Sequence, residues 1–65
     1  MEIISKNIRI ARLVKTYKQE YMAEEMGITQ PAYSKIERGE TDITVSQLRK
    51  IATILGLTLI DLIEK

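Results

Sequence analysis

The stretch Gln19–Gly39 constrains the fold more than any other part of the chain, because it predicts two short helices joined by one tight turn. Its first half carries apolar or small side chains at Met22, Ala23 and Met26, a spacing that lines one side of a helix. Gly27 follows directly, and glycine readily adopts the left-handed conformation that ends a helix. We therefore predict a helix that begins at the start of this stretch and ends at Gly27.

A second helix is predicted from about Thr29 to Arg38. Thr29 can cap its N-terminus, and Pro31 falls in the first turn, where its missing N–H does no harm. Tyr33 and Ile36 mark the side that faces the core. Two helices joined by so short a turn cannot run antiparallel. The geometry favours a steep crossing, the helix-turn-helix, whose second helix is free to enter a DNA major groove.

The motif keeps a specific set of residues at fixed spacing: Gln19, Ala23, Gly27, Ile28, Ser34 and the run Ile36–Gly39. In these residues the chain resembles the phage-repressor, Cro and XRE-type family of lambda repressor-like DNA-binding domains. The resemblance extends over nearly the whole chain and implies an all-α, compact five-helix bundle. It also implies a protein that binds a palindromic double-stranded DNA operator as a homodimer and regulates transcription in a bacterium or phage. RNA polymerase or another protein could be a further partner.

The segment before the motif predicts a helix from about residue 4 to 16. Its broad apolar face is formed by Ile4, Ile8 and Ala11, with Ile10, Val14 and Tyr17 on an adjoining line. Two residues depart from the family pattern, since relatives usually have glycine where Thr16 stands and often serine or threonine where Lys18 stands. We therefore expect either a looser turn over residues 15–18 or a first helix that runs slightly longer.

The segment after the motif predicts two more helices. A capping box that begins at Thr44 opens the first of them, and Gly56 ends it. Thr58 and Asp61 repeat this logic, since a hydroxyl caps a helix and a carboxylate in its first turn suits the helix dipole. The last helix should cover about Leu59 to Ile63. Signals for strands are nearly absent.

Composition excludes several classes of protein. The 65 residues include no cysteine and no histidine, which removes disulfides, zinc fingers and the usual general base. No apolar run approaches the roughly 18 residues of a membrane span. We expect a cytoplasmic protein that does not associate with membranes, and a single DNA-binding domain over residues 1–65. We also expect no cofactor, no metal and no small-molecule ligand.

The formal net charge is only +1, so the total charge argues neither for nor against nucleic acid. The distribution is uneven, because every charged residue from Ser5 to Lys18 is basic: Lys6, Arg9, Arg12, Lys15 and Lys18. We expect the first three of these to share a solvent side of the first helix. A solvated helix face and a phosphate-attracting patch are equally good readings of that side.

Several residues of the second motif helix are candidates for reading base edges. The Gln30 amide can pair with N6 and N7 of adenine or hold a phosphate, and the Lys35 ammonium can donate to O6 or N7 of guanine. Ser34 can face any base, whereas Pro31 and Ala32 offer only apolar contact with a thymine methyl. An exposed glutamine on a helix is usually just solvated. It is the resemblance that favours a DNA contact at Gln30.

Phosphate contacts are expected near the ends of the motif helices. The resemblance implies that Gln19 binds a phosphate jointly with the free N–H groups at the N-terminus of its helix. Lys18 and Arg38 bracket the motif and would add further contacts. Thr29 and Tyr33 complete this set, although the Tyr33 ring should be partly packed, with its hydroxyl reaching water or a phosphate.

Arg12 and Glu37 are expected to form a structural ion pair. The resemblance implies this pair, because relatives place it in the interior, where it ties the first helix to the recognition helix. The alternative is that both are ordinary surface residues. If the pair is well buried, removing one partner costs about 3–5 kcal/mol, because a charge is left uncompensated.

An enzyme is the poorer hypothesis for this chain. Glu20, Glu24 and Glu25 could suggest metal or acid-base chemistry, but they lie on a short exposed helix without histidine or a glycine-rich phosphate loop. A solvated helix face explains them. The serious alternative to DNA binding is a protein-interaction module on the same fold, such as an antitoxin-like partner binder.

The C-terminal segment predicts a twofold homodimer, because it holds more apolar surface than a two-turn helix can turn inward. The candidate interface residues are Leu57, Leu59, Ile60 and Ile63. A symmetric dimer would also suit two half-sites about 34 Å apart on DNA. The alternative is that Leu59, Leu62 and Ile63 pack on the first helix and that dimers form only on DNA.

Overall fold

The computed structural model describes residues 2–64, and in this range all regular structure is helical. The five helices are α1 (Glu2–Val14), α2 (Gln19–Met26), α3 (Gln30–Glu37), α4 (Val45–Leu55) and α5 (Leu59–Ile63). The predicted all-α, five-helix architecture is confirmed. No helix in residues 2–64 is long and apolar enough to cross a membrane.

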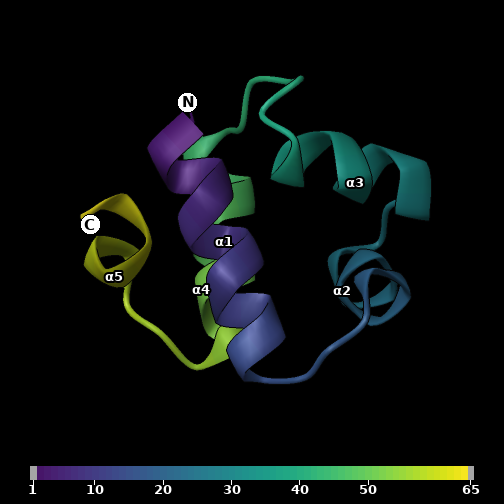
Figure 1. Cartoon of the computed structure of the whole chain (residues 1–65). Helices are drawn as coiled ribbons and strands as arrows, with labels where there is room; N and C mark the ends of the chain where they lie inside the picture. The colour runs from purple at the N-terminus through teal and green to yellow at the C-terminus, as the bar shows by residue number, and fades with distance from the viewer. Residues whose placement is uncertain (1, 65) are drawn as a thin grey trace.

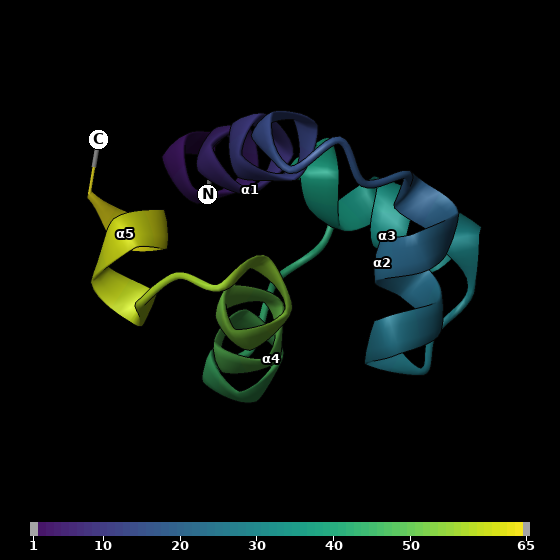
Figure 2. The same cartoon turned by 90° about the horizontal axis from the view of Figure 1, so that it is seen from below.

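Helices α1 and α4 lie side by side in the middle of the molecule, with α2 and α3 on one side of them and α5 on the other (Figures 1 and 2). In Figure 1, α2 is seen end-on while α3 runs across the view, so the two motif helices cross steeply. Every helix contributes to one buried core. Its fully buried large side chains are Ile8, Met22, Tyr33, Ile51, Leu55 and Leu62.

Side-chain caps define where three of the helices begin. The Thr29 hydroxyl accepts a hydrogen bond from the Ala32 N–H (3.2 Å) at the start of α3. Complete capping boxes open α4 at Thr44 and α5 at Thr58, as the sequence predicts. Helix α2 lacks such a cap, because the Lys18 side chain makes no capping hydrogen bond. This is the departure from the family pattern noted at that position.

The first helix differs from its prediction at both ends, since α1 begins at Glu2 and ends at Val14 rather than covering residues 4 to 16. The turn after it is neither loose nor an extra turn of helix. Thr16 adopts a left-handed conformation with φ 59°. Its N–H donates to the Leu13 carbonyl (3.0 Å), and the Tyr17 N–H donates to the Arg12 carbonyl (3.1 Å).

The same pair of backbone hydrogen bonds closes α2, α3 and α4, but there the left-handed residue is a glycine: Gly27, Gly39 and Gly56. All four turns therefore satisfy the last carbonyls of their helices in the same way. Thr16 is the exception in residue type, because a β-branched side chain is strained at positive φ. The hydrogen bonds of the turn evidently outweigh that strain.

The apolar face of α1 is narrower than the sequence suggests. Ile8 is fully buried and Ile4 and Ala11 pack against the core, but Ile10 and Val14 remain 48% and 77% exposed. At about 100° per residue, Ile10 lies nearly opposite Ile8 on the helix. Ile10 and Val14 of the expected adjoining line therefore point to solvent, whereas Tyr17, which lies beyond the end of α1, packs against the core. Helix α1 thus has apolar side chains on two opposite sides.

Replacing Thr16 with glycine should stabilise the protein. The substitution removes the strain at φ 59° and retains both backbone hydrogen bonds, and the relief should exceed the entropy that glycine adds to the unfolded chain. We expect a gain of about 0.5–1 kcal/mol and a rise in melting temperature of several degrees, measured by circular dichroism.

Gly27→Ala is the matched control, because an added Cβ there would meet nothing within 4 Å and φ is +71°. It should lower stability by about 1–2 kcal/mol through backbone strain alone. A lower melting temperature for Thr16→Gly would contradict the assignment of strain to that turn.

Candidate nucleic-acid interface

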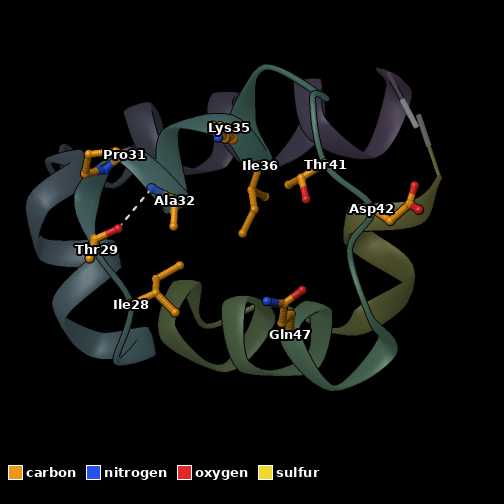
Figure 3. Close-up of a pocket in the computed structure, with 9 residues that line it drawn as sticks. All are labelled: Ile28, Thr29, Pro31, Ala32, Lys35, Ile36, Thr41, Asp42 and Gln47. Carbon is orange, nitrogen blue, oxygen red and sulfur yellow. Dashed lines mark hydrogen bonds between the residues drawn. The ribbon is translucent and has the colours of Figure 1, made fainter.

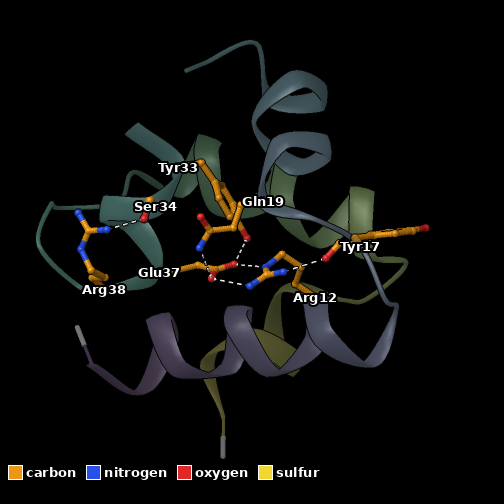
Figure 4. A network of polar contacts seen from close by, with 7 residues as sticks. All are labelled: Arg12, Tyr17, Gln19, Tyr33, Ser34, Glu37 and Arg38. Atoms are coloured by element: carbon orange, nitrogen blue, oxygen red, sulfur yellow. Dashed lines mark hydrogen bonds and ion pairs between the residues drawn. The ribbon is translucent and has the colours of Figure 1, made fainter. Parts of the chain in front are cut away.

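A buried polar cluster joins the first three helices (Figure 4). The Glu37 carboxylate on α3 accepts hydrogen bonds from Arg12 on α1, through Nε to Oε2 (2.5 Å) and Nη2 to Oε1 (3.1 Å). It also accepts from the Tyr33 hydroxyl and from the Gln19 amide on α2 (3.1 Å). Arg12 Nη1 donates in addition to the Tyr17 carbonyl (2.8 Å). The carboxylate is therefore fully engaged by three side chains.

The cluster shifts the titration of its members in the directions expected for a buried ion pair. Burial alone would raise the pKa of Glu37, but the hydrogen bonds from Arg12, Tyr33 and Gln19 together outweigh it and hold that pKa below its ordinary value. The hydrogen bond to Glu37 raises the pKa of Arg12. Burial, followed by the hydrogen bond to the carboxylate, raises the pKa of Tyr33. Arg12 is thus held as a cation, Glu37 as an anion and Tyr33 as a neutral phenol.

This cluster decides which side of α3 faces outward. Three side chains of this helix are buried on one side: Tyr33, Ile36 and Glu37. Ile36 holds that side by apolar packing, and Glu37 holds it through its hydrogen bonds. The side chains left in solvent at its N-terminal end and along its outer surface are those of Gln30, Pro31, Ala32, Lys35 and Arg38. Ser34 is half-buried. The candidate base-reading residues therefore lie on one helix whose orientation is fixed by the packing and hydrogen bonds on its buried side.

Tyr33 cannot serve as a phosphate contact, which corrects the sequence-based assignment. Its side chain is completely buried, and its hydroxyl donates to Glu37 instead of reaching solvent. An aromatic ring in a helix pattern indicates burial. The same pattern does not show that the Tyr33 hydroxyl will donate to the Glu37 carboxylate, one helical turn later.

Two other phosphate candidates have intramolecular partners. The Gln19 amide is half-buried and donates one hydrogen bond to Glu37, which leaves its second amide hydrogen for another acceptor. Arg38 forms an exposed ion pair with Glu40 (2.8 Å) and also donates to the Ser34 hydroxyl. Binding a phosphate through Arg38 would have to compete with Glu40. Lys18 is exposed and has no capping role.

A groove of about 310 Å³ lies between α3 and the start of α4 (Figure 3). Its floor includes Ile28 and Ile36, while Thr41, Asp42 and Gln47 line the side away from the motif turn. The remaining lining residues are the candidate contacts Thr29, Pro31, Ala32 and Lys35. Sequence reasoning missed the loop residues at this edge, because no local pattern shows that the loop folds back beside α3.

The C-terminal segment leaves less apolar surface free than predicted. Leu62 is fully buried, and Leu57 and Leu59 pack against the core of their own chain, so those two are poor candidates for a dimer interface. Ile60 and Ile63 remain 63% and 45% exposed.

Within residues 2–64, no group of three or more carboxylates gathers as a potential metal site.

Comparison with known proteins places this architecture among helix-turn-helix proteins. A family model described as helix-turn-helix matches residues 8–62. Two HTH-type transcriptional regulators of Bacillus subtilis are similar in sequence. The SPbeta prophage-derived YonR is 32% identical over 86% of this chain and 52% of its own length, and YqaE is 35% identical over 88% and 49%. This chain thus spans about half the length of these curated relatives.

Two solved structures share the fold. The clp gene regulator ClgR from Corynebacterium glutamicum superposes with a TM-score of 0.92 and 22% identity, over 95% of this chain and 66% of that one. The hypothetical transcription factor NHTF from Neisseria gives a TM-score of 0.90 and 28% identity, over 97% of this chain and 72% of that one.

Breaking the buried pair from one side should nearly abolish folding. Arg12→Met leaves the Glu37 charge uncompensated and should cost about 3–5 kcal/mol, most of the stability of so small a domain. The double variant Arg12→Met with Glu37→Met should recover much of that loss, because apolar side chains can replace a buried pair. Urea unfolding measures both, together with Glu37→Met alone, and a loss in the double variant equal to the sum of the two single losses would show that the two residues are not coupled.

The cluster should also make the protein sensitive to acid. The pKa of Glu37 is lower in the folded state than in the unfolded one, so its contribution is complete at neutral pH and lost as the pH falls below about 4.5. In that window, stability should fall by up to about 1.4 kcal/mol per pH unit through this group alone. Urea midpoints measured from pH 6 downward test this. The double methionine variant should show a shallower decline, and an identical decline in both proteins would count against Glu37 as the source.

Proposed function

This chain belongs to the XRE-type helix-turn-helix family of transcriptional regulators, and from this premise we propose that it binds double-stranded operator DNA sequence-specifically as a homodimer, with α3 in the major groove. Members of this family regulate transcription and are not enzymes. The proposal concerns residues 1–65 as one DNA-binding domain. It does not extend to the remaining half of the curated relatives.

One observation carries the proposal. Helix α3 buries Tyr33, Ile36 and Glu37 and exposes its other side chains apart from the half-buried Ser34. Hydrogen bonds from α1 and α2 to Glu37 hold the buried side of the helix in place. A recognition helix needs this combination, because base edges are read only when side chains are held at a fixed register in the groove. An ordinary surface helix would not need a buried ion pair to fix its orientation.

The chemistry of the exposed side chains supports base reading. Lys35 can donate to guanine O6 or N7, and Gln30 can pair bidentately with adenine. Ser34 offers a hydroxyl at the margin of the same surface, and Pro31 and Ala32 can contact a thymine methyl. Lys35 is the sharper determinant of specificity, since it is the cation of this surface without an ion-pair partner in residues 2–64.

Phosphate contacts would fix the register of the domain on DNA. Lys18 and Gln19 lie at the N-terminus of α2, where free N–H groups also favour an anion. Thr29 and Arg38 flank α3 and would contact the neighbouring backbone. Exposed isoleucines on α5, Ile60 and Ile63, supply apolar surface for the dimer, and two recognition helices about 34 Å apart would read the two halves of a palindrome.

The Lys35→Ala and Lys18→Ala substitutions should weaken DNA binding in different ways. Lys35→Ala should cost about 1–3 kcal/mol on the preferred site and relax the preference at one base position. Lys18→Ala should weaken binding to all sequences alike and reduce the salt slope by about one. Lys50→Ala, at an exposed lysine of α4 outside the motif, is the control.

Electrophoretic shifts on cognate and scrambled duplexes at several salt concentrations measure these effects. Equal losses on both duplexes for Lys35→Ala would remove it from the base-reading set. The cognate site itself would come from selection on random DNA. If that selection enriched no motif, a protein-interaction module on the same fold would replace the proposed function.

A further inference from the structure

The outer side of α1 carries an apolar surface that neither the core nor the recognition helix uses. Ile3, Ile10 and Leu13 are about half exposed, and Val14 is 77% exposed. With Lys6 they follow steps of three and four residues, so they form one stripe along the side of the helix opposite Ile8. Contiguous apolar surface of this kind on a small domain usually marks a contact with another molecule.

The charged residues of α1 that follow Glu2 are all basic. Lys6 and Arg9 are exposed on the same helix, and neither forms an ion pair within residues 2–64. No acidic residue occurs between Ser5 and Lys18. A complementary surface would therefore combine aliphatic side chains with carboxylates.

Helix α5 has that composition. Ile60 and Ile63 are exposed, and Asp61 and Glu64 are exposed beside them. The same chain cannot bring these side chains onto the outer side of its own α1, because α5 already packs against the flank of that helix. The Asn7 amide fixes this arrangement by donating to the carbonyls of Leu62 (2.9 Å) and Glu64 (3.0 Å). Helices α1 and α5, which carry the basic and the acidic apolar surface, are thus neighbours in each protomer (Figure 2).

We propose that the homodimer forms by reciprocal packing, with the outer side of α1 of one protomer against α5 of its partner. This inference rests on the proposed homodimer and names its contact elements. In a twofold dimer each contact occurs twice. The basic surface of one protomer can therefore meet the acidic surface of its partner, while its own acidic surface meets the partner's basic one. Lys6 and Arg9 then face Glu64 of the partner subunit, and the isoleucines of both helices are buried between the protomers.

Other ways of pairing the same elements are less favourable. If α5 packed only on α5, the dimer would bury two isoleucines per chain and oppose carboxylates of equal charge. Two such side chains fall well short of the roughly 800 Å² that each partner of a stable complex commonly buries. If α1 packed only on α1, Lys6 and Arg9 would face copies of themselves. The reciprocal arrangement uses all six exposed large apolar side chains of α1 and α5 and pairs the charges.

Sedimentation equilibrium without DNA, from micromolar to millimolar protein, tests the apolar part of this interface. Ile10→Glu and Ile60→Glu should each raise the dimer dissociation constant by at least about tenfold. Val45→Glu is the matched control, because Val45 is also exposed (61%) but lies on α4, outside both surfaces. It should leave dimerisation unchanged. Circular dichroism verifies that each variant is folded.

Charge reversal tests the pairing itself. Lys6→Glu and Glu64→Lys should each weaken the dimer, and the chain that carries both changes should regain most of the loss, because the two surfaces exchange sign. A native chain that stays monomeric overturns the inference. So does a dimer that is sensitive to Ile60→Glu but not to Ile10→Glu, or a double charge variant no better than the singles. A shift assay with operator DNA on the same samples reports DNA binding separately, so a failed interface and a failed function are distinguishable.

Discussion

The position of the candidate recognition helix depends on one buried carboxylate. Glu37 accepts hydrogen bonds from Arg12, Tyr33 and Gln19, which lie on α1, α3 and α2 respectively. A charge in the interior is tolerated only when its partners are complete. The three helices must therefore meet in one arrangement, because a small displacement of any of them would leave an acceptor or a donor unsatisfied. Apolar packing of Tyr33 and Ile36 alone would hold α3 in place without fixing its rotation as tightly.

This constraint also decides which side chains remain for recognition. The network removes Tyr33 from the surface entirely and engages half of the donor capacity of the Gln19 amide. Gln30, at the N-terminal end of α3, and Lys35, on its outer surface, have no competing ion-pair partner in residues 2–64. Arg38 differs from them, because Glu40 already neutralises its guanidinium. The same set of hydrogen bonds therefore decides both which side chains of α3 are buried and which remain exposed.

A domain of 65 residues can form only a small core, and two features of the structure follow from this. One is the repeated use of the same closing turn after four helices, which satisfies backbone carbonyls without side chains and is kept even where Thr16 must adopt a left-handed conformation. The other is apolar surface that the core cannot accommodate, such as Ile10 and Val14 on the outside of α1. Both features concern the same helix, whose inner side supplies Arg12 and Ile8 to the interior.

The sequence by itself determined the helices and the motif, because these depend on neighbours along the chain. The signals that end or begin these helices act within one turn of backbone, so they can be recognised without knowing the fold. They are the glycine after Met26, the threonine cap at Thr29 and the capping box at Thr44. The pairing of Arg12 with Glu37, which are 25 residues apart, came from a family resemblance and from no local pattern.

Only the tertiary structure decided where equivalent side chains point. Ile8 and Ile10 are the same residue type on the same helix, yet one is buried and the other is half exposed, because α4 and α5 cover a single side of α1. In the same way, periodicity placed Tyr33 inward but could not supply the partner of its hydroxyl, and composition marked Leu57 and Leu59 as surplus although their own core takes them up. Periodicity describes one helix at a time, whereas burial depends on which other helices arrive and from which direction.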